Sequence, residues 1–265
     1  MRHVGPLAGR RVLITRPTHQ SAALRRQLID QGATVVEAPA IRIAPPQDPR
    51  PLEEALRRLQ SYAWVVVTSP NGARILVERA RNTLDASALA GVLIAAIGPA
   101  TAEALRAGGL RVDLLPSGRY QAEGLLEALA ARVRRGDRIL LLRAAEARPL
   151  LPAGLRALGA EVQVVALYRT MPGEFEAETV GGALKRGEID AVTFTSGSTV
   201  RHLVAAVGAG AFLGPRRART VCLGEVTAAA AAAAGIPVDR VAVRARVDDL
   251  VAAVVDELSG SEASP

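Results

Sequence analysis

The stretch Trp64-Val65-Val66-Val67-Thr68-Ser69-Pro70-Asn71-Gly72 shows how this chain is built. Its apolar run predicts a short strand buried on both faces, as strands of parallel sheets are. Small hydroxyl and turn residues follow, and then a segment with helical periodicity begins. Similar apolar runs begin at Val12, Leu93, Ile139, Val162, Val192 and Val221, and helix-like segments cover 20–31, 51–60, 99–107, 120–132 and 148–158. This alternation predicts an α/β fold with parallel sheets.

The chain repeats this pattern about halfway along its length. Leu13-Ile14-Thr15-Arg16 matches Leu140-Leu141-Leu142-Arg143, and 68–72 matches 195–199, both at an offset of 127 residues. The segment 98–101 matches 224–227 at an offset of 126. A nearly constant offset indicates one α/β unit used twice, and 265 residues suffice for two domains. We predict two similar open parallel-sheet, flavodoxin-like domains with the working site in the cleft between them.

Glycines mark the ends of several predicted helices. Gly32, Gly159 and Gly235 each stand where a helical segment stops and the next strand begins. Glycine accepts the left-handed conformation that a helix C-terminus commonly needs. At the two ends of the chain, residues 1–9 and 259–265 are expected to be frayed.

Four segments place small hydroxyl residues beside a turn between strand and helix. In open α/β sheets, ligands bind beyond the carboxyl ends of the strands. Free backbone N–H groups and the helix dipole favour an anion there. Serine, threonine, asparagine and glycine are also the preferred helix caps, so a purely structural role is the alternative for each segment. The segments are 68–72, 98–101, 195–199 and 224–227.

Composition excludes several classes of function. The single cysteine, Cys222, cannot form an internal disulfide or a cysteine metal cluster, which suits a reducing cytoplasm. The three histidines lack metal-ligand spacing, and no dinucleotide or Walker A fingerprint is present. No apolar run is long enough for a transmembrane helix. The net charge of +7 favours an anionic partner. With 3% aromatic residues, nucleic-acid binding is not expected.

Six motifs follow one another along the chain. They are Leu13-Ile14-Thr15-Arg16-Pro17, Thr68-Ser69-Pro70-Asn71-Gly72-Ala73, Ala96-Ile97-Gly98-Pro99-Ala100-Thr101-Ala102, Leu167-Tyr168-Arg169-Thr170, Phe194-Thr195-Ser196-Gly197-Ser198-Thr199-Val200 and Gly224-Glu225-Val226-Thr227-Ala228. Each motif is weak alone, but in this order and spacing they resemble the uroporphyrinogen-III synthase family over about residues 10–257.

The resemblance implies an interleaved chain path. Residues 1–38 and 172–265 would form one discontinuous domain, and 42–166 the other. Residues 39–41 and 167–171 would link them. The repeat itself does not distinguish this arrangement from two contiguous domains.

The resemblance also implies a reaction. The family closes the linear, many-carboxylate hydroxymethylbilane into uroporphyrinogen III, with loss of water and inversion of ring D through a proposed spiro intermediate. This step serves haem, sirohaem and cobalamin biosynthesis and uses no cofactor and no metal. A cytoplasmic monomer is expected, with transient contact with the preceding pathway enzyme.

Residue by residue, the resemblance implies a catalytic role for Tyr168, whose phenol would help the hydroxyl leave as water. A tyrosine that only packs at the hinge is the alternative. The resemblance implies substrate binding by the side chains of Ser69, Asn71, Thr101, Ser196, Ser198 and Thr227. Some family members have arginine where this chain has Asn71, which puts a direct ion pair there in doubt.

Two arginines at equivalent strand ends, Arg16 and Arg143, are candidates for binding substrate carboxylates. Solvated surface charge is the alternative for both. A different class of function also stays open at this point, a two-domain module that binds a small anion or sugar phosphate without catalysis. Its support is the resemblance of residues 195–199 to a phosphate cradle.

Overall fold

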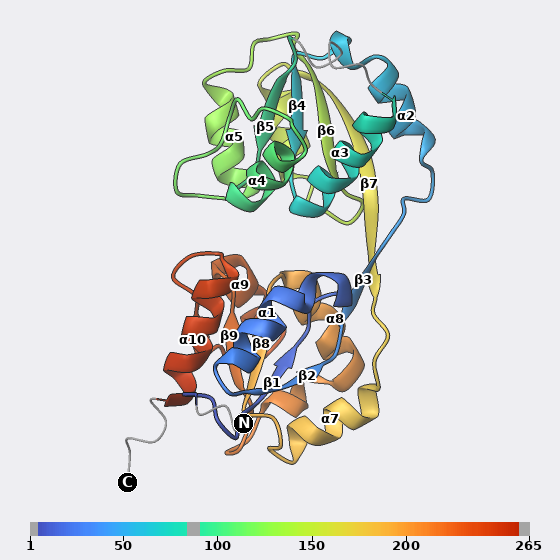
Figure 1. The fold of residues 1–265 in the computed structure, drawn as a ribbon. Coiled ribbons are helices and arrows are strands. Elements are labelled where there is room, and N and C mark those ends of the chain that lie inside the picture. The colour runs from blue at the N-terminus through green and yellow to red at the C-terminus, as the bar shows by residue number, and fades with distance from the viewer. Residues whose placement is uncertain (1–4, 84–90, 260–265) are drawn as a thin grey trace. The chain divides into compact units, whose positions relative to one another are not determined.

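The computed structural model describes residues 5–83 and 91–259 and divides into two compact units. The first unit joins Met1–Arg42 to Met171–Pro265, and the second is Ile43–Thr170. The chain therefore leaves the first unit after Arg42 and returns to it at Met171 (Figure 1). Among the described residues, no helix combines the length and the apolar character needed to cross a membrane.

The first unit has a five-stranded sheet in the order β10-β9-β8-β1-β2. Its four strand pairs, β10–β9, β9–β8, β8–β1 and β1–β2, are parallel. Its strands are β1 (Arg11–Ile14), β2 (Thr34–Glu37), β8 (Ala191–Phe194), β9 (Arg219–Cys222) and β10 (Arg240–Val241). Its helices are α1 (Thr18–Asp30), α7 (Ala177–Lys185), α8 (Gly197–Val207), η3 (Ala209–Phe212), α9 (Glu225–Ala233) and α10 (Val247–Ser259).

The second unit has a five-stranded sheet in the order β3-β7-β6-β4-β5. Its strands are β3 (Ile41–Ala44), β4 (Trp64–Val67), β5 (Leu93–Ala96), β6 (Arg138–Ala144) and β7 (Glu161–Pro172). Its helices are α2 (Arg50–Arg57), η1 (Leu59–Ser61), α3 (Pro70–Thr83), α4 (Pro99–Ala107), α5 (Ala122–Ala130) and α6 (Leu150–Ala157). Residues 167–171, expected as a linker, lie within β7.

The strand order shows how the sequence repeat maps onto the units. The order β9-β8-β1-β2 in the first sheet corresponds to the order β5-β4-β6-β7 in the second. β9, β8, β1 and β2 are therefore the equivalents of β5, β4, β6 and β7, respectively. An isolated parallel bridge from Ala95 to Leu114 takes the place of the β9–β10 pairing. Because β1 pairs with β8 and β4 pairs with β6, each sheet combines strands from both halves of the sequence. This pairing resolves the alternative that the repeat left open.

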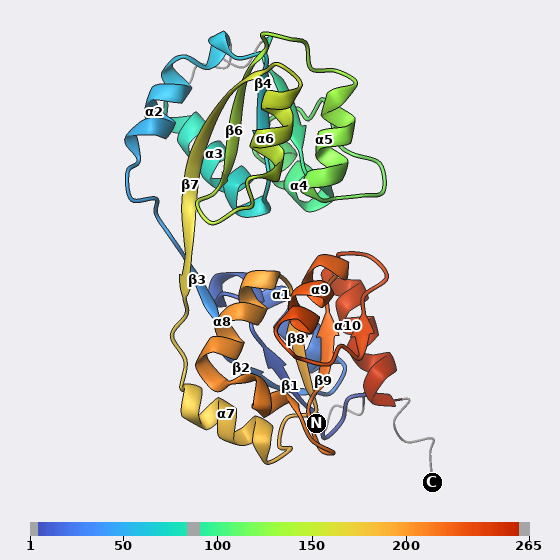
Figure 2. The same ribbon diagram turned by 180° about the vertical axis from the view of Figure 1, so that it is seen from behind.

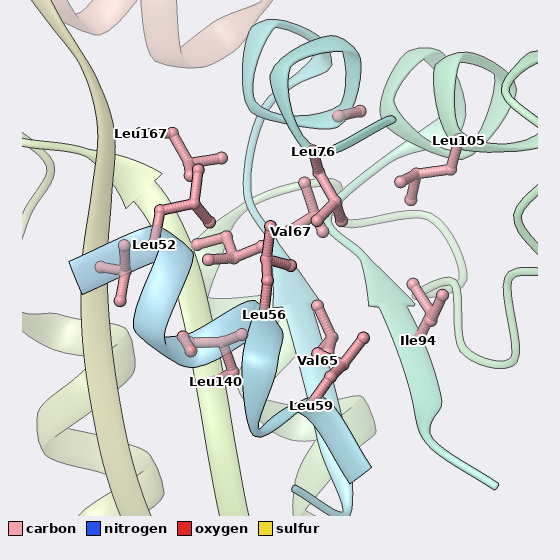
Figure 3. Packing of buried hydrophobic residues seen from close by; sticks show 14 of the residues in the cluster. Leu52, Leu56, Leu59, Val65, Val67, Leu76, Ile94, Leu105, Leu140 and Leu167 are labelled. Carbon is pink, nitrogen blue, oxygen red and sulfur yellow. The ribbon is translucent and has the colours of Figure 1, made fainter. Parts of the chain in front are cut away.

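Successive side chains of a strand point to opposite faces of the sheet and pack into different hydrophobic clusters, as the two-residue period of a strand requires. In β4, Val65 and Val67 pack with α2, α3 and α4 (Figure 3), whereas Trp64 and Val66 pack with α5 and α6. In the first unit, α1 and α10 cover one face of the sheet, and α7, α8 and α9 cover the other (Figure 2). Both sheets are thus buried on both faces, which explains their continuous apolar strands.

The predicted helix ends are confirmed, and the prediction for the N-terminal segment is partly wrong. Gly32 and Gly159 have φ of 94° and 86°, the left-handed region in which glycine avoids the steric cost of a Cβ. Leu7 lies within the segment expected to be frayed, but its side chain is fully buried against α1 and α10, and its N–H donates to the Gln31 carbonyl at 2.9 Å. Residues 1–4 and 260–265 lie outside the described residues.

Candidate functional site

The carboxyl ends of four strands coincide at one edge of the second unit. The parallel register aligns Val67 of β4 with Ala96 of β5 and Leu142 of β6, and Leu142 with Val165 of β7. The turns that leave these strands therefore start at one level. Five of the predicted site residues lie on them or in the strands themselves: Ser69, Asn71, Thr101, Arg143 and Tyr168.

A buried phenol connects two of these turns. Tyr168 on β7 is 7% exposed, and its hydroxyl donates to Ser69 Oγ at 3.0 Å. The same Ser69 oxygen accepts the Gly72 N–H at 2.9 Å, so it also caps the first turn of α3. Ser69 Oγ accepts these two hydrogen bonds, and its own hydroxyl proton stays available for donation to another group.

The surroundings of Tyr168 keep its phenol protonated. Burial raises the pKa of Tyr168, and hydrogen bonds with Ser69 and Asn71 only partly oppose that effect. The negative charge of Glu146 raises this pKa further. A neutral phenol can donate a proton or a hydrogen bond to a departing oxygen, and a phenolate cannot.

Two residues near Tyr168 escaped the sequence analysis. Glu146 Oε2 accepts the Thr170 N–H at 3.1 Å, and Arg74 Nη1 donates to Asn71 Oδ1 at 3.1 Å. The three-residue spacing of Asn71 and Arg74 in a helix could have indicated their contact. Glu146 follows β6 in an irregular turn, where no periodic signal identifies it.

In the first unit, the predicted residues Ser196 and Ser198 lie together at the start of α8. Ser196 Oγ accepts the Thr199 N–H at 3.2 Å, and Thr199 Oγ1 accepts the Ser196 N–H at 3.3 Å, which forms a capping box. The hydroxyls of Ser196 and Ser198 are 3.0 Å apart. Ser69 and Ser196 thus occupy equivalent positions, and both cap a helix. The structural alternative, helix capping, therefore applies to both residues.

The other two turns begin with glycine, which has no side chain to cap a helix. Gly98 precedes α4 and Gly224 precedes α9, both with extended backbone. Three residues on, the predicted side chains of Thr101 and Thr227 are 2% and 5% exposed and lie in the first helical turns. Such helix starts favour an anion through their backbone N–H groups and dipole.

The two candidate arginines differ in their surroundings. Arg16 follows β1 and is half-buried. Arg143 lies inside β6 and is 7% exposed, so it is not a solvated surface charge. Its guanidinium donates to the carbonyls of Arg148 at 3.0 Å and Ala144 at 3.3 Å, and burial lowers its pKa. Substrate binding by either arginine stays a prediction.

Comparison with known proteins identifies the family. The family model for uroporphyrinogen-III synthase HemD matches residues 22–252. A porphyrin biosynthesis protein HemD from Ruminiclostridium josui is 33% identical over 85% of this chain, which spans 44% of that longer protein. A putative uroporphyrinogen-III synthase from Methanothermobacter thermautotrophicus is 36% identical over 74% of this chain and 77% of its own length.

The solved structures agree on the fold. A mutant uroporphyrinogen III synthase from Thermus thermophilus superposes with a TM-score of 0.69 at 23% identity, over 95% of this chain and all of the other. The two five-stranded, mostly parallel sheets are therefore those of a known two-domain fold, as predicted. Of the two classes of function left open by the sequence, the comparisons support the enzyme. The chain belongs to the uroporphyrinogen-III synthase family, the hydro-lyases of tetrapyrrole biosynthesis.

Proposed function

We propose that this chain closes hydroxymethylbilane into uroporphyrinogen III, with Tyr168 as the group that assists loss of water. The observation that carries the proposal is the hydrogen bond from the buried Tyr168 hydroxyl to Ser69 Oγ at 3.0 Å. It holds a protonated phenol at the carboxyl edge of the second sheet, against the turn between β4 and α3.

The proposed chemistry needs two proton transfers, one from the phenol and one back to it. The phenol proton passes to the hydroxymethyl oxygen of the substrate as the carbon–oxygen bond breaks, and the bonding electrons leave with the water. The pyrrole nitrogen stabilises the cation that remains. The cationic carbon bonds to the substituted carbon of ring D, which forms the spiro intermediate. The older carbon–carbon bond at that centre then breaks, and a new bond to the other α-carbon of ring D closes the inverted ring. The proton lost from that carbon returns to the phenolate. The balance is one substrate to one product and one water.

Substrate shape is controlled by binding rather than by reactive groups. A flexible polyanion can form either isomer, and the product depends on how the chain is folded when closure occurs. The starts of α4 and α9 supply backbone N–H groups and positive dipole ends, and the net charge of +7 adds a favourable field. Fixing a near-attack conformation in this way can contribute much of a rate enhancement.

The test is to supply hydroxymethylbilane to the purified protein and identify the isomer formed. Uncatalysed closure gives the type I ring, so type III product at a rate well above background is the expected result. Type I product alone, formed at the background rate, would refute the proposed function.

A further inference from the structure

The turn that follows β6 contacts the β7 backbone immediately after the Tyr168 side chain. The N–H of Ala145 donates to the Tyr168 carbonyl at 3.0 Å. Two residues further along β7, the Thr170 N–H donates to Glu146 Oε2 at 3.1 Å. Adjacent residues of one turn therefore hold the carbonyl of Tyr168 and the amide two positions later.

The Ala145–Tyr168 hydrogen bond belongs to the last parallel pair of β6 and β7, and the Glu146 contact lies just beyond it. The register between β6 and β7 shifts between Arg143 and Ala144, so that Arg143 pairs with Ala166 and Ala144 pairs with Tyr168. Such an irregularity re-aims the side chains next to it. The direction of the Tyr168 side chain consequently depends on contacts from the turn.

The buried Arg143 side chain forms hydrogen bonds with the backbone of the same turn. Its Nη1 donates to the Arg148 carbonyl at 3.0 Å and its Nε donates to the Ala144 carbonyl at 3.3 Å. These carbonyls bracket residues 145–147, which include both residues that contact β7. Among the described residues, no carboxylate lies within ion-pair distance of Arg143, and its guanidinium bonds to these two carbonyls instead. A planar guanidinium suits this task because one rigid group can donate in two directions.

We propose that Glu146 and Arg143 are positioning residues for Tyr168: Glu146 fixes the β7 backbone beside it, and Arg143 fixes the turn that carries Glu146. This inference rests on the proposed function of Tyr168. It replaces substrate binding with an internal role for Arg143, and it assigns a role to Glu146, which no motif or periodicity identifies. Neither residue needs to touch the substrate.

The main test is a double-mutant cycle on Glu146 and Tyr168. Glu146→Ala should lower kcat about ten- to hundredfold with little change in KM, since small misplacements of a reacting group have effects of this size. Glu146→Gln keeps an oxygen acceptor for the Thr170 N–H and should restore kcat to within about threefold of the parent. In the Tyr168→Phe background, Glu146→Ala should cause little further loss of kcat, because the effects of residues that act as a unit are not additive.

Two variants serve as controls. Glu127→Ala removes an exposed carboxylate on α5 that pairs with Arg119, and it should leave kcat and KM unchanged. Arg143→Lys keeps a positive charge but cannot reproduce the two-directional donation of a guanidinium. A positioning role predicts a lower kcat at unchanged KM for Arg143→Lys.

Several outcomes would overturn the inference. They are an unchanged kcat in Glu146→Ala, a full additional loss in the Tyr168→Phe background, or a raised KM at unchanged kcat in Arg143→Lys. The isomer made by the parent protein is measured in the same assay. Type III product from the parent combined with any of these outcomes removes the positioning role while the proposed function stands.

Discussion

Asp113 and Asp239 make the same pair of contacts in the two units. Asp113 Oδ2 accepts the Ile94 N–H at 2.8 Å, and its own N–H donates to the Ile94 carbonyl at 2.8 Å. Asp239 Oδ2 accepts the Thr220 N–H at 2.7 Å, and its N–H donates to the Thr220 carbonyl at 3.0 Å. Both pairs keep the 126-residue offset of the repeat. The two aspartates thus tie the segment after α4 to β5 and the segment after α9 to β9.

We expect Asp239→Asn to destabilise the protein more than Asp113→Asn. Asp239 also receives two hydrogen bonds of 2.6 Å from Arg217 and is more enclosed, whereas Asp113 pairs with the exposed Arg111. Hydrogen bonds to charged groups contribute about 1.5–3 kcal/mol each, and exposed ion pairs about 0–1 kcal/mol. Chemical denaturation of both variants checks the order, and equal losses would contradict it.

Acid should remove the contribution of Asp239 to the stability of the folded protein. Burial alone would raise the pKa of Asp239, but hydrogen bonds from Arg217 and the Thr220 N–H outweigh burial and lower it. A lowered pKa in the folded state means that the stabilisation is complete above the unfolded value of about 3.9 and is lost as pH falls toward the folded value. Thermal unfolding from pH 6 to pH 2 should show a smaller acid dependence in Asp239→Asn than in the parent.

Tyr168→Phe should slow turnover and leave the fold intact. The substitution removes the proton donor but keeps the buried ring, and Ser69 can still cap α3. A general acid commonly contributes about 10²-fold or more, whereas loss of one hydrogen bond costs about 1 kcal/mol. The measurements are kcat with hydroxymethylbilane and the midpoint of thermal unfolding. Unchanged turnover would exclude Tyr168 from the mechanism.

High pH should inactivate the enzyme only after the phenol ionises. Because burial raises the pKa of Tyr168, this loss should begin above pH 10, the ordinary value for tyrosine. A raised pKa also means that the stability from burying the neutral phenol is complete below about pH 10 and is lost as pH rises through the folded value. Ultraviolet titration of the parent and of Tyr168→Phe gives, by difference, the ionisation of Tyr168. The alkaline limb of the kcat–pH profile should coincide with that ionisation. An alkaline limb well below pH 10 would contradict it.

Removing the two serine caps should have unequal consequences. Ser196→Ala and Ser69→Ala should each cost about 1 kcal/mol of stability, the usual contribution of a helix cap. Ser69→Ala should in addition lower kcat, because Ser69 is also the hydrogen-bond partner of Tyr168. Equal effects of the two substitutions on kcat would contradict the link between Ser69 and the phenol.

Much of the fold is predictable from this sequence because its signals are local. Apolar runs fix the strands, glycines end the helices, and the repeat gives the number of units. The partners of β1 and β4 are not predictable, because either pairing of the halves gives the same offset. The burial of Arg143 was also missed, since its partners are backbone carbonyls that carry no sequence signal. Residues Ser69 and Tyr168 were found through motifs rather than periodicity.

The path of the chain through the two units sets an order for folding during synthesis. The second unit is one continuous segment, Ile43–Thr170, and its sheet can be complete as soon as that segment has emerged from the ribosome. The first unit begins earlier and ends later, because β1 needs β8, which lies more than half a chain further on. At about 5–20 residues per second, β1 and α1 wait on the order of ten seconds for their partner. The apolar side chains of the nascent N-terminal segment that pack against β8 and α10 therefore stay uncovered until those elements have been made.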